Sequence, residues 1–125
     1  MSSIYWRAIT VACAVAMAAP ACHADWNTLR FALDEARSRL DRIAKSSDFE
    51  EAKDNARRAK NALEDAAMAA SDINCPSAYS ELDNAATRAR RARDAPDVDE
   101  FSDNYRRAVR GFNDAIGYLR QCSKA

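Results

Sequence analysis

The fold is decided by residues 97–122, which read DVDEFSDNYRRAVRGFNDAIGYLRQC. Apolar side chains recur in this stretch at intervals of three and four residues, which is the spacing of one stripe on an α-helix. The members of the stripe are Phe101, Tyr105, Ala108, Val109, Phe112, Ala115, Ile116 and Leu119. Such a helix gains most of its stability by packing its stripe against other elements, so it needs partner helices from the rest of the chain.

The composition favours long helices over sheets or disorder. Among 125 residues there are only two glycines and three prolines, and 48% of the residues are hydrophobic, which suffices for one packed core. The 19 basic and 19 acidic side chains balance. A nucleic-acid-binding domain is expected to be clearly basic, so the sequence predicts no nucleic-acid partner.

Two helices are predicted between residues 25 and 70. Asp25 can cap the first of them, and Ser47 with Glu50 forms a Ser-x-x-Glu capping box for the second, which runs to about Ala70. The stripe of the second helix is mostly alanine. The stripe of the first is Trp26, Leu29, Leu33, Ala36, Leu40 and Ile43.

A third helix is predicted to begin at Pro76, where a missing N–H costs little, and to end before Pro96. Asp97 and Glu100 then cap the fourth. Short links force neighbouring helices to be antiparallel. The sequence therefore predicts an all-α fold, an antiparallel up-down-up-down four-helix bundle formed by residues 25–125 as a single domain.

Residues 1–24 are predicted to be a cleaved signal peptide. A positive charge precedes an apolar run at 8–19, and small residues follow at 21 and 24. The run is too short to span a bilayer, which takes roughly 20 apolar residues, so the mature chain is expected to have no transmembrane segment. We place cleavage after Ala24, with cleavage after Ala21 as the alternative. Either choice predicts a periplasmic or secreted protein.

A third interpretation of this region is a lipid anchor at Cys22. Residues 19–22 read APAC and resemble a bacterial lipoprotein processing box. The leucine expected three residues before the cysteine is absent, which disfavours acylation.

Export makes the cysteines informative. Cleavage after Ala24 removes Cys13 and Cys22 and leaves Cys75 and Cys122 in an oxidising compartment, where they permit one pairing. One of them precedes the third helix and the other ends the fourth, and these places lie at the same end of an antiparallel pair. The sequence therefore predicts one disulfide.

No catalytic site, metal site or cofactor is expected. The only histidine, His23, precedes the favoured cleavage site, which leaves none for a catalytic triad, a di-iron motif or a haem ligand. The acidic residues between 94 and 103 could ligate calcium, but their spacing matches no EF-hand loop, and helix capping explains nearly all of them. The protein is predicted not to be an enzyme.

The candidate functional residues are seven arginines that gather on the third and fourth predicted helices. They are Arg88, Arg90, Arg91, Arg93, Arg106, Arg107 and Arg110. Such a patch could meet an unknown acidic protein or an anionic surface such as lipid headgroups, although charge runs on solvated helix faces are common. The predicted function is a small exported, non-catalytic binding or structural module that acts through its helical surface.

An alternative function is a carrier of an apolar small ligand within the bundle. The walls of its pocket would be the aromatic residues Trp26, Phe49, Tyr79, Phe112 and Tyr118. Alanine-rich stripes close a bundle tightly, which argues against a sizeable cavity.

Overall fold

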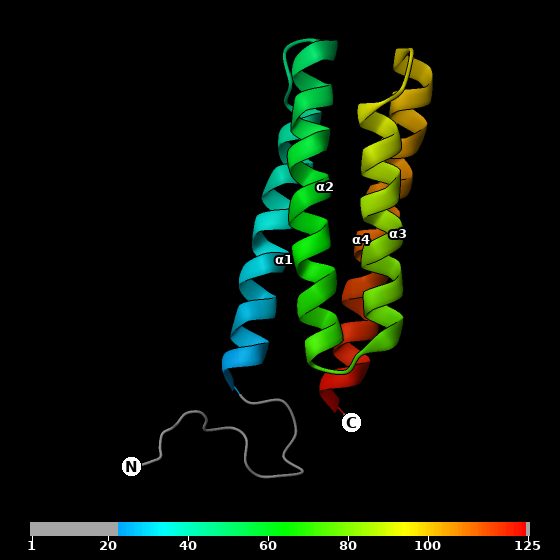
Figure 1. Ribbon diagram of the computed structural model, residues 1–125. Helices are drawn as coiled ribbons and strands as arrows, with labels where there is room; N and C mark the ends of the chain where they lie inside the picture. The colour runs from blue at the N-terminus through cyan, green and yellow to red at the C-terminus, as the bar shows by residue number, and fades with distance from the viewer. Residues whose placement is uncertain (1–22, 125) are drawn as a thin grey trace.

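The computed structural model describes residues 23–124 and shows four α-helices (Figure 1). These are α1 (His23–Ala44), α2 (Phe49–Asp72), α3 (Pro76–Arg93) and α4 (Val98–Lys124). The alternative lipid anchor at Cys22 and residues 1–22 of the predicted signal peptide lie outside the described residues. The last two residues of that predicted peptide, His23 and Ala24, are the first two of α1. No helix within 23–124 combines the length and apolarity that a membrane span requires.

The prediction of an all-α fold is confirmed, and the helices pack in chain order. Helix α1 packs on α2, α2 on α3, and α3 on α4. The three connections lie at alternate ends of the array, so consecutive helices run in opposite directions (Figure 1). Residues 75 and 122, far apart in the chain, therefore meet at one end.

Helices α2 and α3 contribute a core made almost entirely of alanine. The buried residues of α2 are alanines except for Leu63, and those of α3 are alanines except for Leu82. Larger buried side chains come from the outer helices, for example Leu40 of α1 and Phe112 of α4. Because interaxial distance depends on the side chains at the contact, alanine lets the inner helices approach closely.

Helices α1 and α4 are joined by long side chains rather than by close backbone approach. The Tyr105 hydroxyl donates a hydrogen bond to the Leu40 carbonyl oxygen at 3.2 Å. The guanidinium of Arg37 lies 5.2 Å from the centre of the Phe112 ring. Burial raises the pKa of the Tyr105 hydroxyl, and the negative charge of Asp41 raises it further.

Two of the predicted helix starts are corrected. The N-cap of α2 is Asp48 and not Ser47: the Glu51 N–H donates to Asp48 Oδ1 at 2.8 Å, while the Ser47 hydroxyl donates to Glu51 Oε1 at 2.7 Å. Asp48 and Glu51 have the spacing of a capping box one residue later. The Asp48 carboxylate also complements the positive end of the helix dipole. Asp25 does not cap α1, because the helix begins at His23 and places Asp25 inside its first turn.

The other two helix starts agree with the sequence. Pro76 occupies the first turn of α3, directly after Cys75. The Glu100 N–H donates to Asp97 Oδ1 at 2.9 Å, so Asp97 caps α4 as predicted.

Candidate functional site

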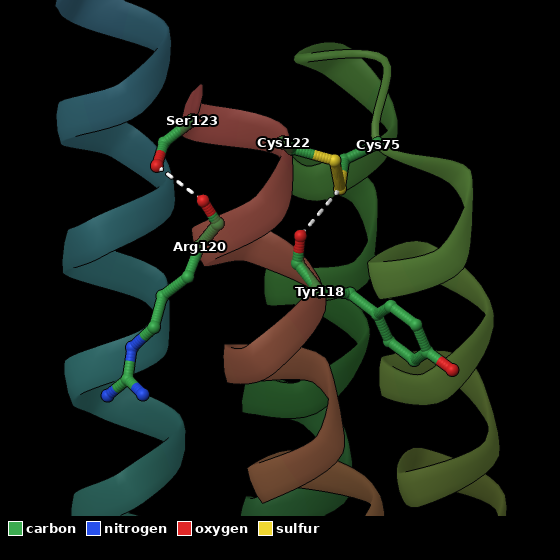
Figure 2. Close-up of a disulfide and its surroundings, with 5 residues drawn as sticks. All are labelled: Cys75, Tyr118, Arg120, Cys122 and Ser123. Carbon is green, nitrogen blue, oxygen red and sulfur yellow. Dashed lines mark hydrogen bonds between the residues drawn. A yellow bond between two sulfur atoms is a disulfide. The ribbon is translucent and has the colours of Figure 1, made fainter. Parts of the chain in front are cut away.

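The predicted disulfide is present and joins the ends of α3 and α4. Cys75 and Cys122 are bonded, with their Cα atoms 6.1 Å apart (Figure 2). Cys75 is fully buried, and its Sγ lies 3.8 Å from the carbonyl oxygen of Tyr118. The bond fixes the relative position of the two helices at this end.

The turn between α2 and α3 places Cys75 for this bond. Asn74 adopts a left-handed conformation with φ of 64°, which asparagine tolerates better than most residues. The Cys75 N–H donates to the Ala70 carbonyl at 3.1 Å, and the Asn74 N–H donates to the Ser71 carbonyl at 2.9 Å. This pair of hydrogen bonds is a Schellman motif, which ends α2 and reverses the chain.

Four of the seven predicted arginines line one groove between α3 and α4, with a volume of about 390 Å³. We call it the α3–α4 groove, and its arginines are Arg88, Arg91, Arg107 and Arg110. Its other lining residues are Glu81, Asn84, Ala85, Thr87, Gly111 and Asp114. Guanidinium groups gathered in this way favour bidentate binding of phosphate or carboxylate.

The remaining three arginines lie outside this groove. Arg93 makes two hydrogen bonds to Asp94, at 2.8 and 3.1 Å, and these hold the pKa of the Asp94 carboxyl below its usual range. Arg106 pairs with Asp103 at 3.6 Å. Arg90 is exposed and does not line the groove. The sequence-predicted patch is therefore divided by the structure.

Within the groove, the arginines differ in how far they are already engaged. Arg107 Nε lies 3.1 Å from Asp103 Oδ2, and Arg88 Nη1 donates to Asn104 Oδ1 at 3.4 Å. Arg91 and Arg110 are exposed and take part in no salt bridge within residues 23–124. These last two guanidinium groups are the ones most available to a partner.

Sequence reasoning missed the groove's acidic and small residues. Gly111 lies against α3, since a Cβ at this position would lie 3.3 Å from the Ala85 Cβ. Glu81 and Asp114 contribute carboxylates to the same lining. Spacings of three, four and seven residues connect these positions to the groove arginines, so a helical-face plot could have found them.

The structure places the aromatic residues proposed for an apolar carrier in different surroundings. Trp26 lines a groove of about 260 Å³ between α1 and α4. Phe49 packs edge-on against Phe101, with ring centres 5.6 Å apart. Tyr79 and Tyr118 are 42% and 38% exposed.

The acidic residues near the start of α4 serve the fold. Asp97 caps the helix, Asp103 pairs with two arginines, and Asp94 pairs with Arg93. No group of three potential metal ligands comes together in the described part of the chain.

No family model matches this chain, and neither a curated protein nor a solved structure is significantly similar to it. What the protein does is therefore inferred from the chemistry of its own side chains.

Proposed function

We propose that this protein is a small exported, non-catalytic binding module that recognises an anionic partner through the α3–α4 groove. The observation that carries the proposal is the convergence of four arginines from two helices on one groove. Export is supported by the signal-peptide pattern at residues 1–24 and by the disulfide, since disulfides persist in oxidising compartments.

The physical basis is the combination of charge and concave shape. A concave site with low-dielectric walls and an excess of one sign of charge concentrates the electric field and attracts oppositely charged partners. The α3–α4 groove has such an excess, because four arginines and two carboxylates line it. Arginine forks can then form paired, charge-assisted hydrogen bonds to carboxylate or phosphate oxygens. Both effects act on the partner without requiring any chemical step.

Helix α2 provides a comparison, because its exposed arginines lie outside the groove. Arg57 and Arg58 both bind Asp54, at 2.8 and 3.0 Å, and their hydrogen bonds lower the pKa of that carboxyl. Arg110 and Asp114 are also four residues apart, in the reverse order, but form no salt bridge within the described range. The groove thus holds guanidinium groups that take part in no salt bridge within residues 23–124, whereas both of these α2 arginines are engaged by one carboxylate.

The test is a double charge reversal, Arg91→Glu with Arg110→Glu. Immobilised wild-type protein is expected to capture an anionic partner from extracytoplasmic extract, and the variant should lose about tenfold or more of this capture, because it repels what the groove attracts. Capture by the wild type should also weaken as salt rises. The bound fraction is measured at low and high salt.

The matched control is Arg57→Glu with Arg58→Glu, which changes the net charge equally on a face outside the groove. Circular dichroism should show the same helix content for all three proteins, because exposed charges contribute little to folding. Equal capture by all three proteins, or capture indifferent to salt, would contradict the proposed function.

A further inference from the structure

The α3–α4 groove carries opposite charges at its two ends. Its acidic end consists of Glu81 and Asp114, and its basic end consists of the four groove arginines. Helix α3 starts at the disulfide and α4 ends there (Figures 1 and 2). Residues early in α3 and late in α4 therefore lie near that bond. Glu81 lies nearer to it than the groove arginines of α3, and Asp114 lies nearer to it than the groove arginines of α4.

Packing at Gly111 confirms that the two acidic residues share an end. A Cβ at Gly111 would lie 3.4 Å from the carbonyl oxygen of Glu81. Asp114 follows by about one turn in the direction of Cys122, which keeps it on the same face and beside the first turns of α3. Asn84 and Thr87 lie between the acidic and basic ends along α3.

Neither end neutralises the other. Glu81 and Asp114 form no salt bridge with any arginine of residues 23–124, and Arg91 and Arg110 form none either. The groove thus holds carboxylates and guanidinium groups that are not paired with each other. A ligand of a single charge would satisfy only one of these two kinds of group.

The spacing sets the size of a ligand that satisfies both. With a rise of about 1.5 Å per residue, the axial separation is about 6 Å from Arg110 to Asp114 and about 10 Å from Glu81 to Arg88. Flexible arginine side chains shorten these gaps. A groove of about 390 Å³ falls in the range of small-molecule sites.

We propose that the α3–α4 groove binds a small zwitterion that carries a phosphate and a primary ammonium a few bonds apart. The phosphate lies at the basic end, where several guanidinium forks match its charge and its oxygens. The ammonium lies at the acidic end, where two carboxylates accept its N–H donors. This inference rests on the proposed function and adds the cationic half of the ligand.

The experiment compares two probes that differ only in the cationic end. O-phosphoethanolamine carries an ammonium where n-propyl phosphate carries a methyl group. The full chain, lacking only the signal peptide, is titrated with each probe at low salt, and dissociation constants come from amide chemical shifts. We expect O-phosphoethanolamine to bind roughly two- to tenfold more tightly, the range for one or two exposed charge pairs.

Two variants assign this preference to the acidic end. Glu81→Gln with Asp114→Asn should abolish the preference for the ammonium while leaving n-propyl phosphate bound at least as well. Asp34→Asn with Glu35→Gln, the same chemical change on exposed residues of α1, should leave the preference intact.

Failure of this inference can be told apart from failure of the proposed function. Equal affinity for the two probes, both weakened by Arg91→Glu with Arg110→Glu, would overturn the zwitterion and leave an anion-binding groove. If that double variant binds both probes as tightly as the wild type does, both the zwitterion inference and the proposed function are overturned.

Vesicles identify the source of the ligand. Phosphatidylethanolamine carries the primary ammonium on a membrane surface, whereas phosphatidylcholine carries a quaternary ammonium without N–H donors. Sedimentation of the protein with vesicles that contain both lipids, but not with vesicles of phosphatidylcholine alone, would assign the ligand to a lipid headgroup. Binding of the free ester without sedimentation would assign it to a soluble molecule.

Discussion

Replacing Phe112 with alanine is expected to lower the free energy of unfolding by about 3–5 kcal/mol. The side chain is only 2% exposed, and the guanidinium of Arg37 lies over its ring. Its removal leaves a cavity and also breaks one of the contacts that join α1 to α4. Urea denaturation followed by circular dichroism measures the loss.

Phe31 supplies the matched control for this measurement. It is 81% exposed on α1, so Phe31→Ala removes the same atoms from water rather than from the core, and we expect a change within about 0.5 kcal/mol. A loss below about 1 kcal/mol for Phe112→Ala would show that the stripe of α4 does not pack as described.

Removing the disulfide is expected to cost about 4 kcal/mol on the loop-entropy model, because it frees a loop closed across 47 residues. This is a large share of the roughly 5–15 kcal/mol that stabilises a typical domain. Cys75→Ala with Cys122→Ala should shift the urea midpoint downward, and reducing agent should shift the wild type by a similar amount.

Thiol alkylation provides the accompanying control. Cys75 and Cys122 should resist labelling in the untreated folded protein and should react after reduction. Rapid labelling without reductant, or equal urea midpoints for the oxidised and reduced protein, would contradict a disulfide in this position.

The features that the sequence predicted well are the apolar stripe of α4 and the disulfide. The stripe of α4 follows from a repeat of three and four residues, and its buried members include Phe101, Phe112 and Leu119. The pairing of Cys75 with Cys122 followed from elimination and from the antiparallel arrangement of short-linked helices. Neither inference required knowledge of side-chain contacts.

The misassigned helix starts have local causes. Ser47 and Asp48 are adjacent, each has an acidic residue three positions later, and periodicity alone does not choose between the two frames. The structure selects Asp48, whose charged oxygen accepts the Glu51 N–H. In α1, Asp25 lies in the first turn and not at the predicted cap position. The helix dipole favours an acidic residue at either place.

The groove required the register between two helices, which the sequence does not display. Arg88 and Arg91 are three residues apart, as are Arg107 and Arg110, so each pair shares a helical face. That the two faces meet depends on the close approach of Gly111 to Ala85. A list of arginines by sequence proximity therefore included three that lie elsewhere and omitted the carboxylates opposite them.

Amide chemical-shift mapping with inorganic pyrophosphate at low salt tests most directly whether the α3–α4 groove is the anion-binding surface. The groove predicts shifts concentrated at residues 84–91 and 107–114, including Gly111, which diminish as the screening length falls from about 10 Å at 0.1 M to about 3 Å at 1 M ionic strength. Shifts of equal size around Arg57 and Arg58, or confined to the α1–α4 groove beside Trp26, would contradict it.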